Sequence, residues 1–152
     1  MITIKNTQRK IHLDVECLRQ DVQKILTALK YQDFDIGLWL TTNKTIRFYN
    51  REYRDKDKAT DVLSFAYHPY LEAGKRIKVK TEEDKNLGDL IISVEYLVKE
   101  AEKHKTTLEK RLRVLVVHGI CHLLGYDHIE DADYRRMYAK EAWLLKKYKS
   151  LV

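Results

Sequence analysis

HGICHLLGYDH, residues 118–128, is the most informative segment of this 152-residue chain. On a helix, residues four apart lie on the same face one turn apart, so His118 and His122 present both imidazoles to one point. Gly125 can adopt the left-handed conformation that ends a helix, and a short turn then lets His128 return toward the same point. The spacing therefore predicts a three-histidine zinc site whose fourth position stays open.

The alternative is that ordinary core or surface histidines happen to have this spacing. Three of the six histidines fall within these eleven residues, and two of them interrupt an apolar helix. Burying an imidazole without a partner costs free energy, which favours a metal site. Cys121 could approach the same ion, but a small thiol on an apolar helix is more typical of a core residue. Tyr126 and Asp127 are placed either to orient a ligand or to shape the turn.

The residues before this segment predict a long buried helix that carries the first two histidines. Thr106 and Glu109 have the spacing of a capping box at its start. Residues 114–124 are apolar nearly all round, as expected of a central helix. A last helix is expected to start at Asp131 or Asp133 and to run into the basic C-terminal tail.

The rest of the chain predicts a small sheet with further helices. Four segments have the length and composition of strands: residues 1–6, 34–42, 62–65 and 87–94. Helices are expected at residues 17–29, after Asn43 as a cap, and after Ser93 as a cap. Residues 67–86 hold the only proline and are expected to form a hairpin, in which Arg76, Lys78 and Lys80 share one face of a strand.

Composition predicts one compact α+β domain spanning residues 1–152. The chain is 44% apolar and 34% charged, with one proline and five glycines, which excludes collagen-like, low-complexity and multidomain organisations. A domain of this size buries roughly two thirds of its surface, so a metal is not needed merely for stability. Two cysteines, no signal-peptide pattern and no long apolar run predict a reducing, cytoplasmic location without a membrane span. A net charge of +6 favours a polyanionic partner.

The histidine spacing matches that of the zinc-dependent metzincin proteases at every position except one. A metzincin has a glutamate directly after the first histidine, where it acts as the general base of peptide hydrolysis. Gly119 occupies that position here and cannot transfer a proton. The segment thus predicts a metal site without the usual proteolytic base.

Three motifs together resemble the YbeY family of bacterial endoribonucleases, which act in ribosomal RNA maturation. They are HGICHLLGYDH, NREYRDKDKATDVLSF at residues 50–65 and LGDLIIS at residues 87–93. The resemblance implies a zincin-like α+β fold with a small mixed sheet and the metal site on the central helix. It also implies that His118, His122 and His128 bind one zinc ion and that Arg54 is the functional arginine. Ala59 stands where the family usually has a proline.

The residues that the resemblance identifies suit the cleavage of a phosphodiester bond. A zinc ion with three neutral ligands keeps its full charge, acidifies water and can neutralise a phosphoryl oxygen. Arg54 would add a planar cation for the extra charge of the transition state. From the residues alone, a surface salt bridge with Asp55 or Asp57 is the favoured role of Arg54, and only the resemblance favours catalysis. No residue clearly identifies the group that removes the proton.

The expected partner is single-stranded ribosomal RNA, together with the small ribosomal subunit and its assembly factors, as the resemblance implies. Two basic surfaces could bind phosphates. One comprises Arg76, Lys78 and Lys80, and the other lies on the tail with Arg135, Arg136, Lys140, Lys146, Lys147 and Lys149. The competing hypothesis is a non-catalytic RNA-binding assembly factor with a structural zinc, which would require a fourth protein ligand.

Overall fold

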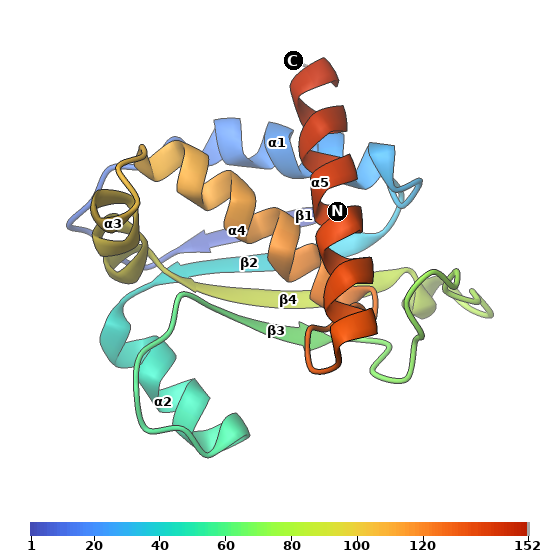
Figure 1. The fold of residues 1–152 in the computed structure, drawn as a ribbon, viewed down its shortest axis with the longest axis horizontal. Coiled ribbons are helices and arrows are strands. Elements are labelled where there is room, and N and C mark those ends of the chain that lie inside the picture. The colour runs from blue at the N-terminus through green and yellow to red at the C-terminus, as the bar shows by residue number, and fades with distance from the viewer. Residues whose placement is uncertain (152) are drawn as a thin grey trace.

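A four-stranded mixed sheet forms the centre of the molecule, in the order β1-β2-β4-β3 (Figure 1). The computed structural model describes the backbone of residues 1–151 and the side chains of residues 1–147. β1, β2 and β4 are parallel, and β3 pairs antiparallel with β4 at the sheet edge. The strands are β1 (Ile2–Asn6), β2 (Asp35–Thr41), β3 (Val62–Ala66) and β4 (Asn86–Ser93). They confirm the predicted α+β fold with a small mixed sheet.

Five helices surround this sheet, and they divide unequally between its two faces (Figure 1). They are α1 (Val15–Ala28), α2 (Asn43–Arg54), α3 (Val94–Lys103), α4 (Leu108–Leu123) and α5 (Asp131–Leu151). α1, α4 and α5 pack together on one face, while α2 packs against β3 and β4 on the other. None of the helices in the described part of the chain is long and apolar enough to cross a membrane.

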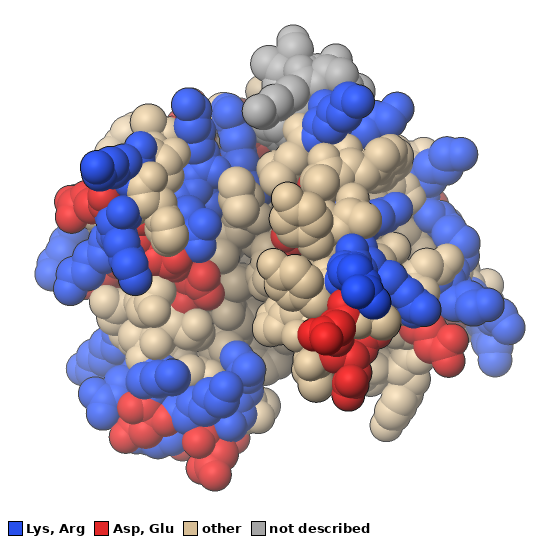
Figure 2. Space-filling view, viewed as in Figure 1, with Lys and Arg blue, Asp and Glu red and all other residues tan. Residues whose placement is uncertain are grey.

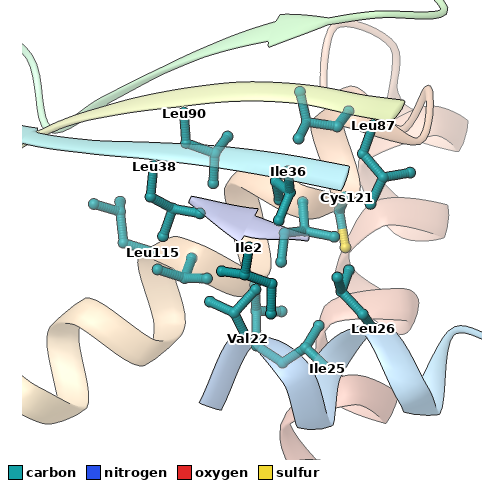
Figure 3. Close-up of a cluster of buried hydrophobic side chains, with 14 of the residues drawn as sticks. Ile2, Val22, Ile25, Leu26, Ile36, Leu38, Leu87, Leu90, Leu115 and Cys121 are labelled. Carbon is teal, nitrogen blue, oxygen red and sulfur yellow. The ribbon is translucent and has the colours of Figure 1, made fainter. Parts of the chain in front are cut away.

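The main hydrophobic core lies between the sheet and the helices α1 and α4 (Figure 3). Leu38 and Leu90 project from neighbouring strands toward Leu115 on α4, and Val22 on α1 faces the same core. Since successive strand residues point to opposite faces, Ile91 contributes instead to a smaller cluster under α2. The core on the α4 side is thus formed by apolar side chains of the sheet and the helices.

Helix caps confirm one sequence prediction and correct another. The Ser93 hydroxyl accepts a hydrogen bond from the Tyr96 amide at the start of α3, as predicted. The N-cap of α4 is Thr107, whose hydroxyl accepts from the Lys110 amide, so the capping box predicted from Thr106 is wrong by one residue.

Asn43 plays a different role from the predicted cap. Thr42 is the N-cap of α2, and Asn43 is the first helical residue. The Asn43 amide donates to the Glu95 carboxylate at 2.8 Å, and its side-chain oxygen accepts from the Ser93 hydroxyl at 2.7 Å. These bonds tie the start of α2 to the start of α3.

The hairpin predicted at residues 67–86 is wrong. Between β3 and β4 the chain forms an irregular loop whose only regular element among the described residues is a short 3₁₀ turn, Glu82–Asp84. The Asp84 carboxylate accepts from the Lys80 and Thr81 amides, which lowers the pKa of Asp84 and folds the end of the loop into a capped turn. The alternating charges of residues 76–80 suggested strand pairing, but hydrogen bonds to the Asp84 carboxylate form a turn there instead.

Candidate metal centre

Helix α4 brings two histidine side chains together near its C-terminal end. His118 Nε2 and His122 Nε2 lie 3.1 Å apart, as expected for residues one turn apart on one helix face. The chain then returns after the helix, so that one ligand nitrogen from each of His118, His122 and His128 lies within 4.8 Å of the others. The predicted histidine cluster is therefore present in the structure.

A glycine makes this return of the chain possible. Gly125 has φ of +92°, a conformation that side-chain-bearing residues rarely adopt. A β-carbon at this position would also overlap the carbonyl oxygen of Leu71 in the loop between β3 and β4. The turn that delivers His128 thus depends on glycine both for backbone conformation and for close packing.

Glu141 on α5 orients the first histidine. His118 Nδ1 lies 2.7 Å from Glu141 Oε1, and both side chains are partly buried. An ionised carboxylate only accepts hydrogen bonds, so the bond places the proton of His118 on Nδ1. Nε2 then keeps its lone pair and faces the other histidines. Sequence reasoning missed Glu141 because it lies 23 residues away on another helix, without a local motif.

Burial keeps the second histidine in the form that binds metals. The pKa of His122 is lowered to about 4, mainly because the ring is buried and secondly because His118 and His128 are near. The imidazole is therefore neutral at pH 7, and metal ions bind the neutral ring.

Three other residues lie near the cluster. Cys121 is fully buried in the main core, and burial raises the pKa of its thiol to about 12, which confirms a core thiol. The Asp127 carboxylate accepts from the Ile129 amide and so shapes the turn. The backbone of Tyr126 is hydrogen-bonded to the His122 side chain. Among the side chains that the structure describes, the group able to hold a metal contains only the three histidines.

The donor set fits a first-row ion such as zinc. Tetrahedral coordination with Zn–N bonds of about 2.0–2.1 Å places the ligand nitrogens roughly 3.4 Å apart. The His118–His122 separation of 3.1 Å is close to that value, and the limit of 4.8 Å for the trio requires only a small shift of side chains. Three nitrogen ligands leave a coordination position available to a substrate or water.

Arg54 lies in the same pocket as the three histidines. This pocket, of about 470 Å³, is lined by the histidines, by Arg54 at the end of α2, by residues 60–64 of β3 and the preceding loop, and by Asp127 and Ile129 beside the third histidine. Figure 2 shows the surface hollowed between the part over α2 and the start of α5. Asp57 pairs with Arg47 at 2.8 Å, and within the described residues Arg54 forms no ion pair. The salt bridge expected from the sequence alone is thus absent there, and the guanidinium remains available.

Comparison with known proteins assigns the family. The profile of the family described as endoribonuclease YbeY matches residues 3–149. The chain belongs to the YbeY family. A human endoribonuclease YbeY is 37% identical over 144 residues, which cover 95% of this chain and 86% of the relative. A Listeria monocytogenes endoribonuclease YbeY is 41% identical over 149 residues, covering 95% and 92%. The solution structure of a Thermotoga maritima protein matches with a TM-score of 0.64 at 27% identity, covering 97% of this chain and 89% of its own.

Gly119, which occupies the position of the metzincin glutamate, is packed against the core of this YbeY-family chain. A β-carbon on Gly119 would lie 2.9 Å from the methyl groups of Leu90 on β4. The position next to the first histidine therefore points into the core rather than into the metal pocket. No side chain on it could act as a base at the site without displacing Leu90.

The predicted RNA-contacting residues of this YbeY-family chain lie outside the metal pocket. Arg76 donates to the carbonyl oxygens of Leu29 and Lys30 and stacks over the Tyr31 ring at 3.9 Å, so it fastens the loop to the end of α1. Lys78 and Lys80 are exposed on the same loop, which is not a strand.

The second basic surface that the sequence predicts lies on α5. Arg136 and Lys140 line a different hollow, next to Trp143. The side chain of Lys149 lies outside the described residues.

Replacing Glu141 with alanine is expected to weaken metal binding by about 10–100-fold, because His118 loses the bond that fixes its tautomer and ring orientation. Competition with a chromogenic chelator measures the dissociation constant. Glu102→Ala, at an exposed site on α3, is the matched control and should leave the constant unchanged. Equal affinities for the Glu141→Ala variant and the unmodified protein would contradict this role.

Proposed function

We propose that this chain is a zinc-dependent endoribonuclease that cleaves single-stranded RNA in ribosomal RNA maturation. One ion per chain would be held by His118, His122 and His128. The observation that carries the proposal is the pocket that joins three metal-binding nitrogens to the guanidinium of Arg54. Membership of a family described as endoribonuclease YbeY supports the reaction class.

The residues of the pocket match the needs of phosphodiester cleavage. When bound, the ion would supply positive charge that stabilises a phosphoryl oxygen and lowers the pKa of water. His118, His122 and His128 would hold it, with Glu141 fixing the orientation of His118. Arg54 presents planar N–H donors that bind phosphoryl oxygens and stabilise the charge of the transition state.

An open ligand set favours an enzyme over an assembly factor with a structural zinc. Structural zinc sites generally have four protein ligands, whereas catalytic sites keep one position free. Within the described side chains the cluster has three ligands, and Cys121 is buried in the core rather than beside them. The arrangement supports catalysis at this site.

Substrate and partners follow from the same proposal. The substrate would be ribosomal RNA in the cytoplasm, on or near the small ribosomal subunit and its assembly factors. Lys78 and Lys80 would contact phosphates away from the cleaved bond, since both are exposed. Arg76 was expected to join them, but its guanidinium is engaged with carbonyl oxygens, and we assign it to holding the loop.

We expect the purified protein to cleave a labelled single-stranded RNA and to leave the same sequence intact in a duplex. Chelation should abolish cleavage, and stoichiometric zinc should restore it, because the three histidines would hold the ion. The end groups of the products identify whether water or the 2′-hydroxyl attacks. Undiminished cleavage by protein shown to be metal-free would refute the proposal.

A further inference from the structure

An open groove of about 400 Å³ lies on the face of the sheet opposite to α4. Its walls are formed mainly by four aromatic side chains, Trp39, Tyr49, Tyr53 and Phe65. Neither the metal site nor the main core uses these rings. Tyr53 is 66% exposed although it is a large aromatic residue, so this surface is apolar and accessible.

The four rings form one continuous row. Trp39 and Tyr49 meet edge to face with centroids 5.5 Å apart, and Tyr49 and Tyr53 are nearly parallel at 6.0 Å. Tyr53 in turn meets Phe65 edge to face at 5.3 Å. These contacts hold the rings in place, which lowers the entropy cost of using them as a platform for another planar group.

Cations border this row of rings. Lys5 Nζ lies 4.8 Å from the centre of the Trp39 ring. Helix α2, which supplies Tyr49 and Tyr53, also carries four basic residues against one acidic residue, and Figure 2 shows Lys and Arg side chains gathered over it. The basic residues are exposed: Lys44, Arg47, Arg51 and Arg54. Aromatic rings interleaved with cations are typical of surfaces that bind single-stranded nucleic acids.

The groove and the metal pocket share two walls. Tyr53 lines the groove, and the next residue, Arg54, lines the metal pocket. On β3, Phe65 lines the groove and Ser64 lines the pocket, because neighbouring strand residues point to opposite faces. Because β3 is an edge strand of the sheet, a polynucleotide with its scissile phosphate at Arg54 can pass around this edge and place a flanking nucleotide in the groove.

The floor of the groove includes a carboxylate. Asp89 is exposed on β4, and its carboxylate lies over Gly37, where a side chain on the glycine would overlap it. A carboxylate repels phosphate but accepts hydrogen bonds from base amino groups. The groove thus suits the base of a nucleotide, while the cations around it suit the phosphates.

We propose that this groove is a second subsite for single-stranded RNA, in which a base that flanks the cleaved bond stacks on Tyr53, lies against Trp39 and donates to Asp89. The inference rests on the proposed function and extends it. Duplex RNA keeps its bases stacked within the helix, so the subsite selects single strands. A protein partner would also suit an apolar surface, but continuity with the metal pocket and the basic character of α2 favour RNA.

Fluorescence of Trp39 tests the subsite directly, since the chain has two tryptophans. Trp143 lines a separate hollow on α5, so Trp143→Phe leaves Trp39 as the reporter, and Trp39→Phe leaves Trp143. Titration with a single-stranded RNA 12-mer should quench Trp143→Phe and leave the emission of Trp39→Phe unchanged. The matching duplex should quench neither variant.

Substitution tests the contribution of stacking to affinity. Tyr53→Ala should weaken binding of the same 12-mer by about tenfold, measured by fluorescence anisotropy, with metal content unchanged. Tyr138→Ala, which removes a ring 64% exposed on α5, is the control and should bind normally.

Three results would overturn the subsite. If the protein binds and cleaves RNA while Trp39 emission and the affinity of Tyr53→Ala stay unchanged, the subsite is wrong and the proposed function stands. If a protein partner rather than RNA changes Trp39 emission, the groove belongs to that partner. If RNA is neither bound nor cleaved, both the subsite and the proposed function fail.

Discussion

Metal binding and RNA cleavage should be lost together when His122 is replaced by alanine. In the proposed site the ring would supply one of three ligands, with Nε2 3.1 Å from that of His118, and only two histidines would remain. Metal affinity should fall by more than the roughly 100-fold expected at most when a residue that is hydrogen-bonded to a ligand, such as Glu141, is removed. Metal content per chain, measured by mass spectrometry, and the rate of cleavage of a labelled single-stranded RNA check this result.

The His122→Ala variant should nevertheless fold. The main core between the sheet, α1 and α4 is packed without any contribution from an ion (Figure 3). Circular dichroism should therefore match that of the unmodified protein, and the melting temperature should fall only by the stabilisation that bound metal provides. His12→Ala, at an exposed site before α1, is the control and should keep metal and activity. Wild-type cleavage by metal-free His122→Ala would remove the basis for metal-dependent catalysis.

The central helix and the histidine cluster were predictable because their signals are local. The spacing of His118 and His122 requires only helical geometry, and residues 114–124 are apolar enough to specify burial. Gly125 marks the turn because few other residues adopt its conformation. Each of these inferences depends on residues at most a few positions apart.

Other features depend on contacts between distant segments, which the sequence pattern does not encode. Alternating charges from Arg76 to Lys80 suggested a strand, but Arg76 binds carbonyl oxygens at the end of α1, and the Asp84 carboxylate caps the loop. Glu141 reaches His118 only because α5 packs on α4. The aromatic groove likewise combines strands β2 and β3 with α2, so only Tyr49 and Tyr53, one turn apart on α2, share a local pattern.

For Arg54, the role implied by the family resemblance differs from the role that its neighbours in the sequence favour. From the local sequence, an acidic neighbour was the favoured partner of its guanidinium. The structure pairs Asp57 instead with Arg47, two turns earlier on α2, at 2.8 Å. The position of Arg54 beside the three histidines follows from the way α2 ends against the loop before β3, which only the folded chain reveals.

Replacing Arg54 with alanine should leave fold and metal content intact and reduce RNA cleavage by about 10²–10³-fold, the range typical of removing one donor that stabilises transition-state charge. The effect should appear mainly in kcat, because the guanidinium interacts most strongly with the extra charge of the transition state. Single-turnover cleavage and anisotropy binding to the same RNA separate the two parameters.

Arg51→Ala is the matched control, since Arg51 lies on the same helix, pairs with Glu52 and does not line the pocket. It removes the same charge from α2, so a general electrostatic role for the helix would reduce binding equally in both variants. Arg54→Lys should recover only part of the rate, because a lysine keeps the charge but loses the planar, bidentate donors. Equal cleavage rates for Arg54→Ala and Arg51→Ala would assign Arg54 to RNA attraction rather than to the chemical step.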